Sequence, residues 1–176
     1  MNHRHEHALC EVADLHDIHD EITGIRRHLH QHPELSFEEV DTAALVASRL
    51  QEWGYAVTRH IGGNGLVATL KSGSSTRSIG LRADMDALPI HEETGLLLGA
   101  AKHLARTRRF DGTLHLIFQP AEEAGFDSGA QKMLADGLFE RFPCDAVFGI
   151  HNHPGVEAGT FMFRSGPFMA ACDTVK

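Results

Sequence analysis

Apolar residues recur at helical spacing in the first part of the chain. Residues 12–29 carry an apolar side chain at every third or fourth position, which predicts an amphipathic helix that ends before Pro33. A second helix is predicted from Ser36, because Ser36 and Glu39 have the spacing of a capping box. Gly54 is its expected C-terminal stop. The buried face of this helix is predicted to be Val40, Ala44, Ala47, Leu50 and Trp53.

Further along, short apolar runs predict strands that alternate with helices. The strands are expected at residues 55–61, 66–70, 78–85, 113–119, 145–150 and 160–164. Pro120 has no amide to donate, so the fourth of these strands should stop at Gln119. Helices are expected over 97–108 and from Ser128 through Leu138. This alternation predicts βαβ units and an α/β fold with three layers, an α/β/α sandwich.

Three of the predicted strands end in side chains that can bind a metal ion. The pairs are Asp84 and Asp86, Glu122 and Glu123, and His151 and His153. Ligands bind beyond the carboxyl ends of the strands in open α/β sheets, so neighbouring strands of one polarity would bring these pairs into one crevice. Carboxylate oxygen and imidazole nitrogen suit zinc, manganese, cobalt or nickel better than calcium. Each acid pair alone is also typical of a turn, and a histidine at a strand end can simply donate a hydrogen bond to a carbonyl, so the prediction of a metal site depends on their combination.

Composition narrows the possible partners. The chain has 176 residues, 42% of them hydrophobic, which suits one domain with a substantial core. Its formal charge is -8 with no basic block, which argues against nucleic acid as a partner. There is no apolar run of membrane-spanning length and no secretory signal at the start. Three widely spaced cysteines form no disulfide framework, so a cytoplasmic location is expected.

Four ordered motifs contain five of the 14 histidines and both acid pairs. They are residues 27–39 (RHLHQHPELSFEE), 81–90 (LRADMDALPI), 118–123 (FQPAEE) and 149–155 (GIHNHPG). Together they resemble the amidohydrolase branch of the M20 metallopeptidases, which includes hippurate hydrolases, N-acyl-amino-acid amidohydrolases and auxin-conjugate hydrolases. The resemblance implies a zinc-exopeptidase-like catalytic domain. It also implies hydrolysis of the N-acyl bond of a small N-acyl amino acid, hippurate-like or N-acetylated, with two divalent cations (Mn, Zn, Co or Ni).

The resemblance also implies a role for each site residue. Glu122 would be the general base that deprotonates a metal-activated water and later protonates the leaving amine. Glu123 and His151 would be metal ligands. Asp86 would act in catalysis by orienting a metal-binding group, and Asp84 stands where related branches place a ligand. The histidines of the first motif, at positions 28, 30 and 32, would be structural.

The chain also departs from the family pattern. The family carries a His-Ala-Cys-Gly-His-Asp-Gly-His stretch that supplies a Cys and a His ligand, but here residues 90–95 lead directly into 96–105. This predicts an internal deletion between Gly95 and Leu96, and no cysteine of the chain stands in the missing place. The family also continues into a lid and dimerisation domain, and later returns to the catalytic domain. The expected organisation is therefore a His-rich extension (1–11), a partial catalytic domain (12–170) and the start of the missing lid domain (171–176).

The sequence supports three functional readings. The first is an amidohydrolase whose chain by itself is inactive or nearly so, since Glu123 and His151 would have only Asp84 or His153 as substitute ligands. The second is a non-catalytic pseudoenzyme or interaction module that keeps the fold. The third, which does not depend on these departures, makes the N-terminal histidines at positions 3, 5, 7, 16 and 19 a metal-buffering tract. The family is usually homo-oligomeric, and the lost strands would also leave an unpaired sheet edge that favours association.

Overall fold

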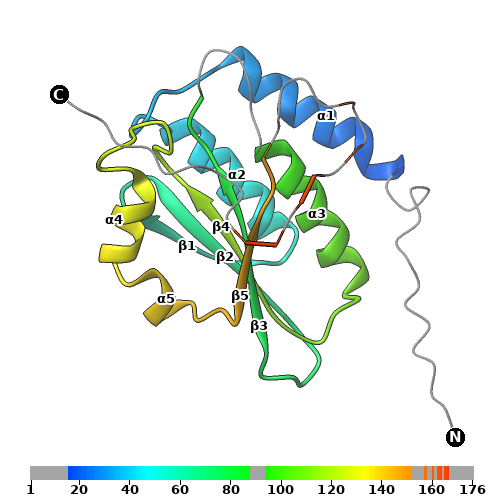
Figure 1. The fold of residues 1–176 in the computed structure, drawn as a ribbon. Coiled ribbons are helices and arrows are strands. Elements are labelled where there is room, and N and C mark those ends of the chain that lie inside the picture. The colour runs from blue at the N-terminus through cyan, green and yellow to red at the C-terminus, as the bar shows by residue number, and fades with distance from the viewer. Residues whose placement is uncertain are drawn as a thin grey trace, which may run out of the picture.

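The computed structural model describes residues 16–87 and 94–151, together with 157, 160, 162–163 and 165–166. In chain order its elements are α1 (His16–Gln31), α2 (Val40–Glu52), β1 (Ala56–Ile61), β2 (Gly65–Ser72), β3 (Ser78–Asp84), α3 (Thr94–Thr107), β4 (Gly112–Gln119), α4 (Gly129–Ala135), α5 (Leu138–Arg141) and β5 (Ala146–Gly149) (Figure 1). None of the described helices is both long enough and apolar enough to cross a membrane.

One five-stranded sheet runs through the molecule in the order β1-β2-β4-β3-β5. The β1–β2 and β2–β4 pairs are antiparallel, whereas β3 pairs in parallel with both β4 and β5. Asp84 at the end of β3 lies opposite Gln119 at the end of β4, and Arg82 lies opposite Gly149 of β5. The carboxyl ends of three neighbouring strands are therefore nearly level with one another.

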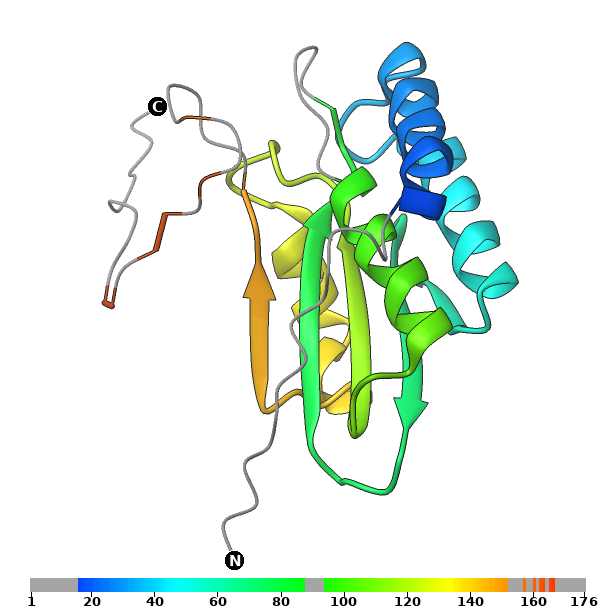
Figure 2. The same cartoon turned by 90° about the vertical axis from the view of Figure 1, so that its right-hand side faces the viewer.

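Helices cover both faces of this sheet, which confirms the predicted α/β/α sandwich (Figure 2). Alternate strand residues such as Leu116 and Phe118 pack with α1, α2 and α3, because successive side chains of a strand point to opposite faces. Ile117 and Val67 face the other way and pack against Met133 of α4 and Leu138 of α5. Because side chains alternate between the two faces of the strands, the sheet has a hydrophobic core on each face.

The capping box predicted at Ser36 and Glu39 is wrong. The helix α2 begins one residue after Glu39, and Glu39 makes no side-chain cap bond. The cap comes from Glu34, whose carboxylate oxygens accept hydrogen bonds from the backbone amides of Asp41 (3.0 Å) and Thr42 (2.7 Å). The side chains of Ser36 and Glu39 form hydrogen bonds with distant residues instead.

Other helix predictions also need correction. Val40 and Ala44 are exposed because the buried stripe of α2 is turned away from them. That stripe consists of Thr42, Ala43, Val46, Ala47 and Leu50. The helix predicted from Ser128 through Leu138 is two helices, since Gly137 adopts a left-handed φ of 75° between α4 and α5. Of the strand predicted over 160–164, Thr160, Met162 and Phe163 are described and are not in a strand.

The outer strand β5 carries apolar side chains to the surface. Val147 is 45% exposed and Phe148 is 57% exposed, and β5 pairs only with β3 within the described sheet. An exposed apolar edge strand favours pairing with another chain. Self-association through this edge stays a prediction.

Candidate metal centre

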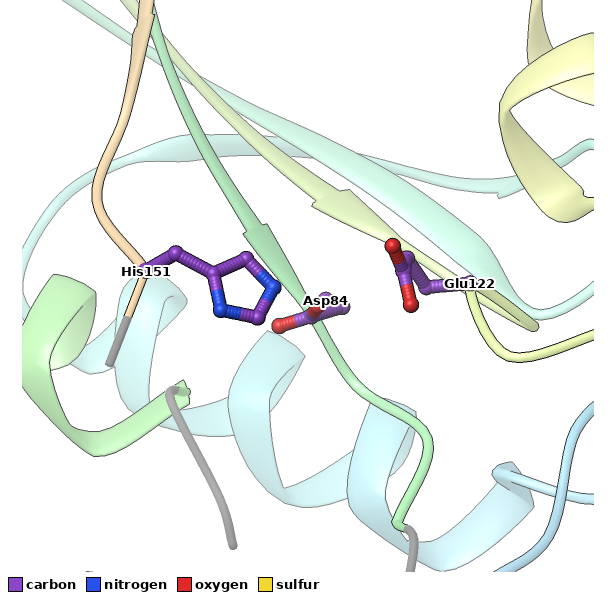
Figure 3. Close-up of side chains that lie close together, drawn as sticks. All are labelled: Asp84, Glu122 and His151. Atoms are coloured by element: carbon purple, nitrogen blue, oxygen red, sulfur yellow. The ribbon is translucent and has the colours of Figure 1, made fainter. Parts of the chain in front are cut away.

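Three metal-capable side chains meet where β3, β4 and β5 end. Asp84 is the last residue of β3, Glu122 lies in the turn after β4, and His151 follows β5 by two residues. One ligand atom from each lies within 4.8 Å of the other two, and Figure 3 shows the three side chains pointing into the same space. Asp84 and Glu122 are half-buried, and His151 is exposed. Parallel pairing of the strands explains how residues nearly 70 positions apart come together.

Asp84 is held by a neighbour that sequence reasoning missed. Arg82 lies one strand repeat earlier, and its Nη1 is 3.4 Å from the Asp84 Oδ2. The Nε of Arg82 also donates to the Gln119 Oε1 at 3.0 Å. The sequence did contain a signal for this contact. Arg82 precedes Asp84 by two residues in the same strand, and residues i and i+2 lie on one face of a strand. These contacts fix the direction of Asp84 at the strand end.

Asp86 points toward the backbone of the turn after β4, whereas Asp84 points into the converging group. Its buried carboxylate accepts hydrogen bonds from the Ser36 hydroxyl (2.8 Å) and from the backbone amides of Glu122 (2.9 Å) and Glu123 (3.0 Å). Asp86 therefore holds the backbone that carries both glutamates. It does not belong to the group whose ligand atoms converge.

Glu123 is exposed, and its carboxylate lies outside that converging group. Partial burial and the negative charges of Glu122, Asp86 and Asp84 raise the pKa of Glu123, and His151 opposes this effect. The side chain therefore lies in the field of the same acids. His153, the further ligand considered from the sequence, lies outside the described residues, as do the N-terminal histidines at positions 3, 5 and 7.

The donor set suits one divalent transition-metal ion. Two carboxylate oxygens and one imidazole nitrogen match the ligands of catalytic zinc sites, which commonly use three protein ligands and an open position. Manganese, cobalt and nickel accept the same donors. Within the part of the chain that the structure describes, no second group of three such side chains converges, so a second ion would need further ligands.

Comparison with known proteins agrees with the motifs and the strand-end geometry. The model of peptidase family M20/M25/M40 matches residues 80–167, which is half of the chain. The chain belongs to this family. The match begins within β3 and includes all three members of the converging group.

Two relatives and one solved structure show how this M20 chain compares with others. It is 44% identical to the hippurate hydrolase of Campylobacter jejuni, covering 93% of this chain and 47% of that protein. It is 40% identical to the N-acetyl-L-cysteine deacetylase of Bacillus subtilis, with 93% and 44% covered. The YXEP protein of Bacillus subtilis, a dinuclear metal-binding peptidase from the M20 family, superposes with a TM-score of 0.70 at 33% identity, covering 80% of this chain and 44% of that one.

The chain spans about half the length of the curated relatives it matches. Its alignment with the hippurate hydrolase runs over 184 positions, although 93% of the 176-residue chain is only about 164 residues. About 20 aligned positions therefore hold no residue of this chain. An internal deletion in this chain would leave such unmatched positions, and its place between Gly95 and Leu96 stays a prediction.

Proposed function

We propose that the site where β3, β4 and β5 end binds a divalent cation and that the chemistry of this site is hydrolysis of the N-acyl bond of an amino acid. The observation that carries the proposal is the convergence of Asp84, Glu122 and His151 within 4.8 Å at the ends of three parallel strands. The relatives named above act on hippurate and on an N-acetylated amino acid, which supports small N-acyl amino acids as the substrate class.

Each residue then has a defined task. Asp84, His151 and Glu123 hold the cation, and Glu122 takes a proton from the attacking water and returns it to the leaving amine. When bound, the cation supplies Lewis-acid polarisation of the amide carbonyl and acidifies the attacking water. Asp86 keeps the Glu122 and Glu123 backbone in place through its two amide contacts. Glu122 rather than Glu123 lies in the converging group, so cation binding by Glu123 requires its exposed side chain to turn toward Asp84 and His151.

We further propose that this chain alone turns over substrate slowly or not at all. Its described residues supply one converging donor group, whereas its solved relative is a dinuclear metal protein. The same shortage of ligands favours a second function, a non-catalytic interaction module that keeps the fold. The hydrolase and the interaction module differ in one measurable quantity, which is turnover above that of a variant lacking the proposed base, Glu122.

The experiment uses purified full-length chain loaded with Mn²⁺, Co²⁺ or Zn²⁺ and assayed on hippurate and N-acetyl amino acids. Glu122→Gln and Glu123→Gln are compared with Glu140→Gln, which removes the same charge from an exposed position on α5. Turnover well above the Glu122→Gln variant would overturn the proposed inactivity and support the hydrolase.

Metal content after desalting tests the cation site itself. Retention of one ion per chain, lost in His151→Ala and kept in Glu140→Gln, supports the site. If Glu122→Gln loses the ion and Glu123→Gln keeps it, the two glutamates have exchanged the roles proposed for them. Absence of bound metal in the wild-type chain under every loading condition would refute the cation site.

A further inference from the structure

A fully buried glutamate in the first motif contacts the turn that carries Glu122. The side chain of Glu39 is 0% exposed. Its Oε1 accepts hydrogen bonds from the backbone amides of Phe37 (2.9 Å) and Ala121 (2.8 Å), and its Oε2 accepts one from the Asn64 Nδ2 (3.2 Å). Burying a carboxylate is costly unless such partners satisfy it, so this position does more than complete a helix.

The contact falls on a residue whose backbone is strained. Ala121 has a positive φ of 47°, a left-handed conformation that residues other than glycine rarely adopt. Such conformations persist where the surrounding structure holds them in place. Glu39 accepts from the Ala121 amide, and Asp86 accepts from the next two amides. Three consecutive amides of the turn are thus bound by two carboxylates from distant parts of the chain.

We propose that Glu39 is a positioning residue for the candidate metal centre. By fixing the left-handed turn at Ala121, it sets the direction in which the backbone carries Glu122, the proposed base, and Glu123, the proposed ligand, toward Asp84 and His151. The inference rests on the proposed cation site. It assigns a function to a residue of the first motif. The family match does not address this residue, because Glu39 lies before the matched residues 80–167.

Glu39 would act on the metal through the turn alone. It is not a member of the converging group, so it does not itself bind the cation. Partners that orient metal ligands typically change metal affinity about 10- to 100-fold when they are replaced. A purely structural role predicts lower stability with unchanged metal affinity in the folded protein.

The decisive variant is Glu39→Gln, which keeps the shape of the side chain and removes its charge. Because bonds to a charged acceptor are about twice as strong as neutral ones, we expect the Ala121 amide to exchange about tenfold faster with solvent. The amide of Leu116, in the middle of β4, reports global opening in the same experiment. The matched control is Glu38→Gln, which removes an exposed charge one residue away.

Metal affinity is measured with Mn²⁺ and Zn²⁺ by calorimetric titration of the three proteins. Support consists of at least tenfold weaker binding by Glu39→Gln, unchanged binding by Glu38→Gln, and an acceleration of exchange by Glu39→Gln that is larger at Ala121 than at Leu116. Equal affinity in Glu39→Gln and wild type would overturn the proposal, and so would equal acceleration at both amides. If the wild-type chain takes up no cation, the proposed function fails and the link to metal affinity fails with it. The exchange at Ala121 then decides separately whether Glu39 holds the turn.

Discussion

Replacing Asp86 by asparagine should destabilise the whole domain. The carboxylate is 9% exposed and accepts three hydrogen bonds, from Ser36, Glu122 and Glu123. The best orientation of an asparagine keeps its oxygen toward Ser36 and Glu123 and turns its NH₂ group toward the Glu122 amide. One bond is then lost and two become neutral. Since a bond to a charged group contributes about 1.5–3 kcal/mol and neutral bonds about half as much, the free energy of unfolding should fall by at least about 3 kcal/mol.

Urea unfolding followed by fluorescence measures this loss, because Trp53 is the single tryptophan and packs against the larger core. Asp20→Asn is the control, since Asp20 is exposed and pairs only weakly with His19, and it should change stability by less than about 0.5 kcal/mol. A double-mutant cycle of Asp86→Asn with Ser36→Ala should give a coupling energy of about 1 kcal/mol. A loss below about 0.5 kcal/mol, or no coupling, would refute the assignment of Asp86 as the residue that holds this turn.

Three further changes test the fold around the site. Burial alone would raise the pKa of Glu34, but its hydrogen bonds from the α2 amides outweigh burial, and the pKa is lowered overall. The ionised Glu34 carboxylate therefore stabilises the fold at neutral pH, and this contribution is lost as the pH falls from the ordinary pKa of a glutamate through the lowered one. Glu34→Gln should cost about 1 kcal/mol in urea unfolding at neutral pH and progressively less in acid, and a cost independent of pH would contradict this. Leu50→Ala should cost about 3 kcal/mol by the same assay, because Leu50 is fully buried, and a cost below about 1 kcal/mol would show that the core collapses around the gap. Gly129→Ala should cost about 2 kcal/mol or more and alter amide exchange in the turn that carries Glu122 and Glu123, since its Cβ would clash with the Pro120 carbonyl oxygen. Wild-type stability of this variant would show that the start of α4 can shift to relieve the clash.

The strands and layers could be predicted from sequence because their signals are local. The apolar runs that end at Gln119 and before His151 depend only on burial, and the structure places β4 and β5 at nearly the predicted bounds. Parallel order of β3, β4 and β5 then brings the strand ends together without any further information. Family membership followed from the motifs and was confirmed by the family match.

Contacts between distant segments could not be predicted in the same way. Ser36 and Glu39 have the spacing of a local cap, yet Ser36 bonds to Asp86 and Glu39 bonds to Ala121, 82 residues away. In each case the side-chain oxygen that could cap the helix bonds to a distant residue instead, and only the packed structure decides which of the two bonds forms. The choice between Glu122 and Glu123 as the inward-pointing acid has the same cause, because it depends on the backbone conformation at Ala121.

The acids at this end of the sheet fall into two physical classes, and the difference argues for a cation site over a solvated acidic turn. Glu34 and Asp86 are satisfied by backbone amides, and for Glu34 these bonds lower the pKa despite burial. Glu123 shows the opposite behaviour, since burial and neighbouring acids raise its pKa. A solvated turn would spread its carboxylates apart, because like charges repel. Here amide-bound carboxylates hold the backbone so that Glu122 stays close to Asp84 and His151, an arrangement whose charge repulsion a bound cation would offset in addition to the Arg82 beside Asp84.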